Sequence, residues 1–156
     1  MYLCMYIPNI CRLGNYLLAD YDPNLNREDS TQVYFGHFPS GCSVKQAAHF
    51  SQAANTHEFK RFDFGTNVEN LLAYGQTKPP MIDLTKISGI PVALIAGTKD
   101  HLSTVEDTRW AKKQLEKVLV HYKEYELGHL SYFIARDMSY FTKDVIKLLK
   151  QYHPII

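Results

Sequence analysis

The chain has 156 residues, a length that fits one ordinary domain with a sizeable buried core. Hydrophobic residues make up 46% of it and charged residues 21%, which is the balance of a folded globular protein. With 17 Lys and Arg residues against 16 Asp and Glu residues the net charge is only +1, so we expect no nucleic-acid partner, which would require a basic face.

The sequence indicates neither a membrane span nor a leader peptide. No apolar stretch reaches the length of a transmembrane segment. The first twenty residues are apolar and aromatic, but they have no basic start and contain Pro8 and Gly14, so they do not predict a signal peptide. The three cysteines, Cys4, Cys11 and Cys42, are odd in number and lack metal-ligand spacing, so at least one thiol is free or paired outside the chain.

The first half of the chain, residues 1–80, is rich in aromatic residues, Asn, Gly and Pro and shows little periodicity. Its stretch DYDPNLNREDST, residues 20–31, is a loop by composition. A helix is predicted over SVKQAAHFSQAAN, residues 43–55, because breakers are few and Ser43 supplies a hydroxyl suited to N-capping. The double proline of YGQTKPP, residues 74–80, then predicts a boundary.

The second half, residues 81–156, has a more regular pattern. IPVALIAG, residues 90–97, is a short apolar run typical of a strand that is buried on both faces. Residues 103–117 predict a helix, which opens with Ser103 and Glu106 at capping-box spacing.

A second strand and helix follow. VLVHYKEYE, residues 118–126, is β-branched and aromatic and predicts the strand. The helix is predicted over residues 137–152, with five apolar side chains on one face: Phe141, Val145, Leu148, Leu149 and Tyr152. The order strand, helix, strand, helix predicts an α/β fold with parallel strands joined by a right-handed crossover.

Polar side chains follow both predicted strands at the point where each ends. The first strand runs into GTKD, which contains Asp100, and the second into LGH, which contains His129. Because parallel neighbours end at the same edge of a sheet, we expect the two side chains to meet there. A carboxylate in that position would hold the imidazole in one tautomer and stabilise its charged form during proton transfer.

Two other interpretations of these residues stay open. Asp100 could cap the helix that follows it, and His129 could be an ordinary turn residue. A metal site built from Asp100, His101 and His129 is the weaker alternative, because side chains of adjacent residues in an extended segment point apart.

Five blocks occur in a fixed order along the chain: HFPSGCSVKQAAHFSQA (37–53), FDFG (62–65), YGQTKPP (74–80), IPVALIAGTKD (90–100) and GHL (128–130). Together they resemble the acid lipase family, the gastric and lysosomal triacylglycerol and cholesteryl-ester hydrolases. The first block is similar to that family's H-x-P-x-G-x-S-V-x-x-x-x-H-x-x-Q-A segment. The similarity runs from about residue 11 to the end of the chain.

The resemblance implies a partial α/β-hydrolase fold. Residues 81–156 would be the C-terminal part of the hydrolase core, with strands and helices of the parallel sheet, and residues 1–80 part of a mostly helical or irregular cap, or lid. Carried over residue by residue, the resemblance makes Asp100 the triad acid and His129 the general base. It also implies a neutral lipid ester as substrate, no metal or organic cofactor, and a lysosomal or secreted location.

The chain departs from the family pattern at three places. Thr98 follows Gly97 where the family has two glycines before its acid, and Ser131 stands where the family has an Asp two residues after its histidine. Cys11 resembles one half of a cap disulfide, but the expected second cysteine is replaced around Ala19–Asp20, so its oxidised pairing stays open.

No nucleophilic serine of the hydrolase type is found. An α/β-hydrolase presents its serine in a G-x-S-x-G turn between a strand and a helix, and this chain contains no such sequence. GCSVK, residues 41–45, is the nearest match, but it lacks the second glycine and a preceding buried strand, so we interpret Ser43 as a helix N-cap. Cys42 is no better a nucleophile. We therefore expect the chain alone to be inactive.

Two functional hypotheses follow. In the first, the chain is the C-terminal part of a serine lipase that cleaves triacylglycerols or steryl esters by Ser-Asp-His acyl transfer. A missing N-terminal portion or a partner chain would supply the serine, and a complete enzyme of this type exceeds the ~250 residues of a large single domain. In the second, it is a non-catalytic lipase-like fragment that serves as a lipid-binding or partner-binding subunit. The missing serine favours the second hypothesis, and the presence of Asp100 and His129 favours the first.

Overall fold

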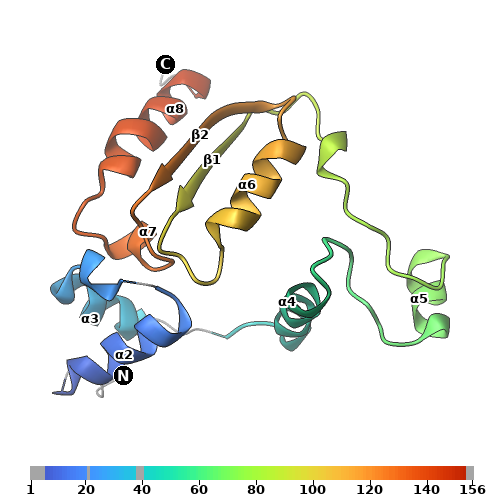
Figure 1. Ribbon diagram of the computed structural model, residues 1–156, viewed down its shortest axis with the longest axis horizontal. Coiled ribbons are helices and arrows are strands. Elements are labelled where there is room, and N and C mark those ends of the chain that lie inside the picture. Colours follow the sequence, from blue (N-terminus) through green and yellow to red (C-terminus); the bar gives the residue numbers. More distant parts are fainter. Residues whose placement is uncertain (1–5, 21, 38–40, 154–156) are drawn as a thin grey trace. The chain divides into compact units, whose positions relative to one another are not determined.

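A computed structural model describes residues 6–20, 22–37 and 41–153 of the chain (Figure 1). Its longer helices and its strands are α2 (Pro8–Leu18), α3 (Glu28–His37), α4 (Val44–Thr56), α5 (Asn67–Tyr74), β1 (Val92–Gly97), α6 (Val105–Gln114), β2 (Leu119–Tyr125), α7 (Ser131–Ile134) and α8 (Ile146–Tyr152). Two 3-10 helices, η1 (Pro23–Leu25) and η2 (Leu84–Lys86), and a π-helix, η3 (Tyr140–Val145), complete them. None of the helices in the described ranges combines the length and apolarity that a membrane span requires.

The chain forms two compact units. One consists of residues 1–38 and 87–156 and contains both strands, and the other consists of residues 39–86 and contains α4 and α5. The predicted division into a cap, residues 1–80, and a hydrolase core, residues 81–156, stays a prediction, because compactness does not report the role of a segment.

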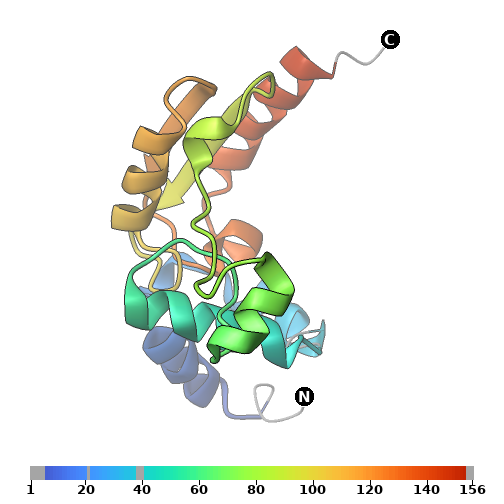
Figure 2. The same cartoon turned by 90° about the vertical axis from the view of Figure 1, so that its right-hand side faces the viewer.

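The two strands pair in parallel, which confirms the predicted strand order. β1 and β2 are in register from Ala93 opposite His121 to Gly97 opposite Tyr125, with α6 as the connection between them. In Figures 1 and 2 the sheet lies between α6 and α8. This unit is therefore a small α/β arrangement in which both strands end at the same edge.

The N-terminus of α6 differs from the predicted one by one residue. The N-cap is Thr104, whose Oγ accepts from the Asp107 N–H at 3.3 Å and donates to the Asp107 carboxylate at 3.0 Å. The predicted box of Ser103 and Glu106 was wrong, because the Ser103 N–H is already bound by Asp100 in the preceding turn. The helix therefore begins only after that turn is complete.

One other predicted boundary also changes. Residues 20–31 were predicted as a loop, but η1 lies within them and α3 begins at Glu28. Glu28 and Asp29 lie in the first turn of α3, where acidic side chains stabilise the helix dipole.

The predicted C-terminal helix begins as the π-helix η3 and continues as α8. In a π-helix residues five apart share a side, so Tyr140 and Val145 both face the sheet and pack near Ile95 and Tyr125. Phe141, predicted to be on the apolar face, is 41% exposed instead. Leu149 and Tyr152 are likewise exposed, whereas Val145 and Leu148 are partly buried.

Two apolar clusters flank the loop that follows β2. Leu127 packs with Ala135 and Tyr140 against residues of the sheet, while Leu130 packs with Ala19 and Ile134. Leu127 precedes His129 by two residues and Leu130 follows it directly, so the loop is anchored by apolar contacts on both sides.

Candidate functional site

The loops that follow β1 and β2 are hydrogen-bonded to each other. The Thr98 N–H donates to the Tyr125 carbonyl at 2.9 Å, and the Lys99 N–H donates to the Leu127 carbonyl at 3.0 Å. The backbones of the two loops approach so closely that a Cβ on Gly97 would lie 2.4 Å from the Leu127 carbonyl oxygen. Only glycine fits there, and this crossing brings the next residues of both loops together.

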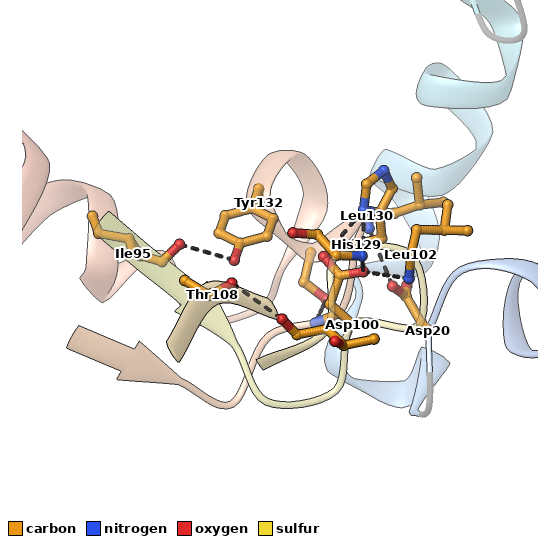
Figure 3. Close-up of polar contacts among 12 residues, drawn as sticks. Asp20, Ile95, Asp100, Leu102, Thr108, His129, Leu130 and Tyr132 are labelled. Atoms are coloured by element: carbon orange, nitrogen blue, oxygen red, sulfur yellow. Dashed lines mark hydrogen bonds and ion pairs between the residues drawn. The ribbon is translucent and has the colours of Figure 1, made fainter. Parts of the chain in front are cut away.

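Asp100 and His129 meet beyond this crossing, as the positions of the two strands predict (Figure 3). The His129 Nδ1 lies 3.1 Å from one Asp100 carboxylate oxygen and 3.2 Å from the other. An ionised carboxylate only accepts hydrogen bonds, so the Nδ1 atom carries the proton in this pair. The pair thus sets the tautomer that leaves a lone pair on Nε2.

The two side chains differ sharply in exposure. The Asp100 side chain is 1% exposed, whereas the His129 side chain is 42% exposed. Among the residues that the structure describes, the His129 Nε2 has no hydrogen-bond partner. A buried acid behind an accessible imidazole is the arrangement that lets a histidine accept and return a proton at Nε2.

Asp100 also fixes its own loop. Its Oδ1 accepts from the backbone N–H groups of Leu102 and Ser103, each at 2.8 Å. Asp100 was also interpreted as a possible cap of the following helix. In the structure Asp100 closes the turn before α6, whereas Thr104 is the N-cap of the helix. These backbone donors hold the carboxylate still beside His129.

The partly buried phenol of Tyr132 lies on the sheet side of the pair (Figure 3). Its hydroxyl donates to the Ile95 carbonyl at 3.2 Å. Burial, reinforced by the negative charge of Asp100, raises the pKa of Tyr132 to about 12. Tyr132 therefore remains a neutral hydrogen-bond donor at physiological pH.

The two candidate nucleophiles weighed from the sequence lie in the other compact unit. Ser43 is the N-cap of α4, and its carbonyl accepts from the N–H groups of Gln46 and Ala47, although its hydroxyl makes no capping bond. Cys42 is free and exposed. The side chain of Cys11, expected from the resemblance to form a disulfide, lies outside the described residues.

The metal alternative required Asp100, His101 and His129 to converge on one point. Within residues 6–20, 22–37 and 41–153 no group of three such side chains is placed to hold a metal ion.

Three further polar residues support the His129 loop and were not predicted: Asp20, Asn26 and Ser131. All three are buried, and Asn26 is hydrogen-bonded to both Asp20 and Ser131. Asp20 and Ser131 stood out only as departures from a family pattern, and Asn26 lay in a predicted loop. Because these contacts join residues 105 and 110 positions apart, no local pattern in the sequence indicates them.

Curated proteins match most of the chain. The gastric triacylglycerol lipase of Bos taurus is 32% identical over 82% of this chain and 32% of its own length. Lipase member K of Homo sapiens is 26% identical over 92% of this chain and 36% of its own length. The lysosomal acid lipase/cholesteryl ester hydrolase of Rattus norvegicus is 26% identical over 97% of this chain and 38% of its own length.

This chain is a relative of the acid lipases. No protein-family model matches it. The chain spans about a third of the length of the curated relatives that it matches.

Proposed function

We propose that the chain contributes the acid and the base of a serine lipase with an α/β-hydrolase fold. Asp100 is the acid that orients the His129 imidazole, and His129 is the general base. The observation that carries the proposal is the buried Asp100 carboxylate on Nδ1 of a half-exposed His129, at the edge where two parallel strands end. The matched gastric and lysosomal lipases support this assignment.

The proposed substrate is a neutral lipid ester, either a triacylglycerol or a steryl ester. One matched relative is named a triacylglycerol lipase and another an acid lipase and cholesteryl ester hydrolase. A gastric and a lysosomal protein among the relatives support a secreted or lysosomal location. The serine would come from a portion of the protein outside this chain or from a partner chain.

The reaction proceeds by two acyl transfers. His129 Nε2 takes the proton of the serine hydroxyl as the serine oxygen attacks the ester carbonyl, and then delivers that proton to the departing alcohol. Water attacks the resulting acyl-serine, again losing its proton to Nε2, and the proton returns to the serine as the fatty acid leaves. Asp100 stabilises the imidazolium that forms in each step. No step requires a metal or an organic cofactor.

Hydrolysis by the native protein tests the proposal. The protein is purified from its source organism through a tag at the C-terminus of this chain, so that any serine-bearing portion is retained, and is assayed on triacylglycerol and cholesteryl ester emulsions. We expect Asp100→Asn to lower kcat by about 10⁴-fold, as loss of the orienting acid does in serine hydrolases, and His129→Ala to lower it at least as far.

The matched control is His121→Ala, which removes a histidine from β2 that has no contact with Asp100 or His129. It should retain most of the activity. If His129→Ala hydrolyses either ester as fast as the unaltered protein, His129 is not the base, and the non-catalytic subunit becomes the better hypothesis.

A further inference from the structure

The most deeply buried polar groups of the strand-containing unit lie under the His129 loop. Asp20 and Ser131 are the largest side chains with less than 2% exposure among the described residues, and Asn26 beside them is 4% exposed. An apolar core would normally occupy such a position, because buried polar groups are costly unless they are fully hydrogen-bonded. Here Asn26 is hydrogen-bonded to both Asp20 and Ser131.

The hydrogen bonds among these side chains run in one direction. The Asn26 amide nitrogen donates to Asp20 at 2.9 Å, which turns the Asn26 amide oxygen toward Ser131. The Ser131 hydroxyl donates to that oxygen at 2.7 Å. A hydroxyl has only one proton to give, so the Ser131 oxygen is left to accept.

Both ends of this chain of hydrogen bonds hold backbone next to His129. The Gly128 N–H donates to the Ser131 hydroxyl at 2.9 Å, and the Leu130 N–H donates to Asp20 at 3.2 Å. The residues immediately before and after His129 are therefore bonded to the same buried set. Among the described residues no hydrogen bond or ion pair joins the His129 imidazole to these three side chains, so their hydrogen bonds act on the imidazole through the backbone.

The segment that carries Asp20 also touches the Asp100 loop. The His101 N–H donates to the Ala19 carbonyl at 3.0 Å, and Asp20 lies opposite Asp100 in an isolated antiparallel bridge. Residues 19 and 20 thus lie against both loops of the candidate pair, which makes the spacing between Asp100 and His129 depend on this segment.

We propose that Asp20, Asn26 and Ser131 are positioning residues that fix the backbone around His129 and so hold its Nδ1 on Asp100. The inference rests on the proposed function for the catalytic meaning of His129. It assigns none of the three a contact with substrate. Removal of one hydroxyl, that of Ser131, leaves the Gly128 N–H and the Asn26 oxygen without partners, and the loop relaxes to satisfy them.

The first test follows the Nδ1 proton of His129 by NMR in the 156-residue chain. In the unaltered chain this proton should give a resolved, slowly exchanging resonance, and the ring ¹⁵N shifts should report the Nδ1–H tautomer. Ser131→Ala should lose that resonance and give ring shifts of mixed tautomers. If Ser131→Ala keeps the resonance and the same ring shifts, the inference is overturned.

Tyr140→Phe is the matched control, because it also deletes one buried hydroxyl that is bonded to the segment after His129. The Tyr140 hydroxyl donates to the Tyr132 carbonyl and does not touch the residues that flank His129. This variant loses stability in the same region, but the Nδ1 resonance should remain. A loss of the resonance in both variants would show general loosening and would contradict a specific role for Ser131.

A second measurement uses the unaltered chain and covers the case in which Ser131→Ala does not fold. The amide protons of Gly128 and Leu130 should exchange with solvent more slowly than in an unstructured peptide of the same sequence, since both are bonded to buried acceptors. Exchange at the unstructured rate would overturn the inference. Neither measurement requires ester hydrolysis. A negative result in either one would therefore overturn the positioning role of the three residues without contradicting the lipase proposal.

Discussion

Gly128 shows how little space the loop before His129 leaves for a side chain. A Cβ at this position would lie 2.2 Å from an Asp20 carboxylate oxygen and 2.8 Å from the Asp20 Cβ. We expect Gly128→Ala to destabilise the chain by about 1–3 kcal/mol, the usual cost of overpacking a filled site, as measured by urea unfolding. The loop must move away from Asp20 to accept the methyl group.

Gly14→Ala is the control for this substitution. Gly14 lies within α2, and apart from its chain neighbours and the helix's own backbone no atom of the described residues lies within 4 Å of the position of a Cβ there. Alanine in a helix interior is favoured over glycine by about 0.5–1 kcal/mol, so this variant should gain stability. Equal effects of the two substitutions would contradict the close contact between Gly128 and Asp20.

At the scale of elements, α6 connects the two strands and begins beside the candidate site. Because Thr104 both accepts from and donates to Asp107, Thr104→Ala should cost about 1 kcal/mol in the free energy of unfolding. Ser103→Ala is the matched control, since only the backbone of Ser103 is bonded to Asp100, and should change stability by less than about 0.5 kcal/mol. If Ser103→Ala lowers the free energy of unfolding more than Thr104→Ala does, Thr104 is not the N-cap of α6.

The elements predicted well are those whose signal is local. The apolar run before Gly97 and the β-branched run before His129 predict two strands, and the helical pattern between them predicts their parallel pairing. From that pairing alone the contact between Asp100 and His129 follows. The cap of α6 and the buried face of the C-terminal helix were mispredicted, because a hydrogen bond to Asp100 delays the start of α6 and a π-helical turn changes which side chains face the sheet. Neither feature leaves a periodic pattern in the sequence.

The support beneath the site could not be predicted from one sequence. Asp20 and Asn26 reach Leu130 and Ser131 across more than one hundred residues of chain, and a single Asp or Asn in a polar stretch has no distinguishing context. The contacts exist because two segments far apart in the chain pack together, which is a property of the folded unit.

At the scale of the whole molecule, the sheet is left with open edges. Among the described residues the sheet has only β1 and β2, so each strand has one edge without a partner. Several apolar side chains are also exposed, including Val120 on β2 at 46% and Phe133 on α7 at 70%. Unpaired strand edges with apolar neighbours favour association between chains. We expect the 156-residue chain to associate as its concentration rises, when followed by sedimentation velocity.

A single charge on the sheet should weaken this association. Val120→Lys places a lysine on β2, a common means by which natural edge strands avoid pairing, and should shift the distribution toward the monomer. Val68→Lys makes the same change at an exposed position of α5, far from either strand in the sequence, and should leave the distribution unaltered. A monomeric chain at every concentration, with one cooperative thermal transition, would contradict the expectation and show that β1 and β2 need no further partner.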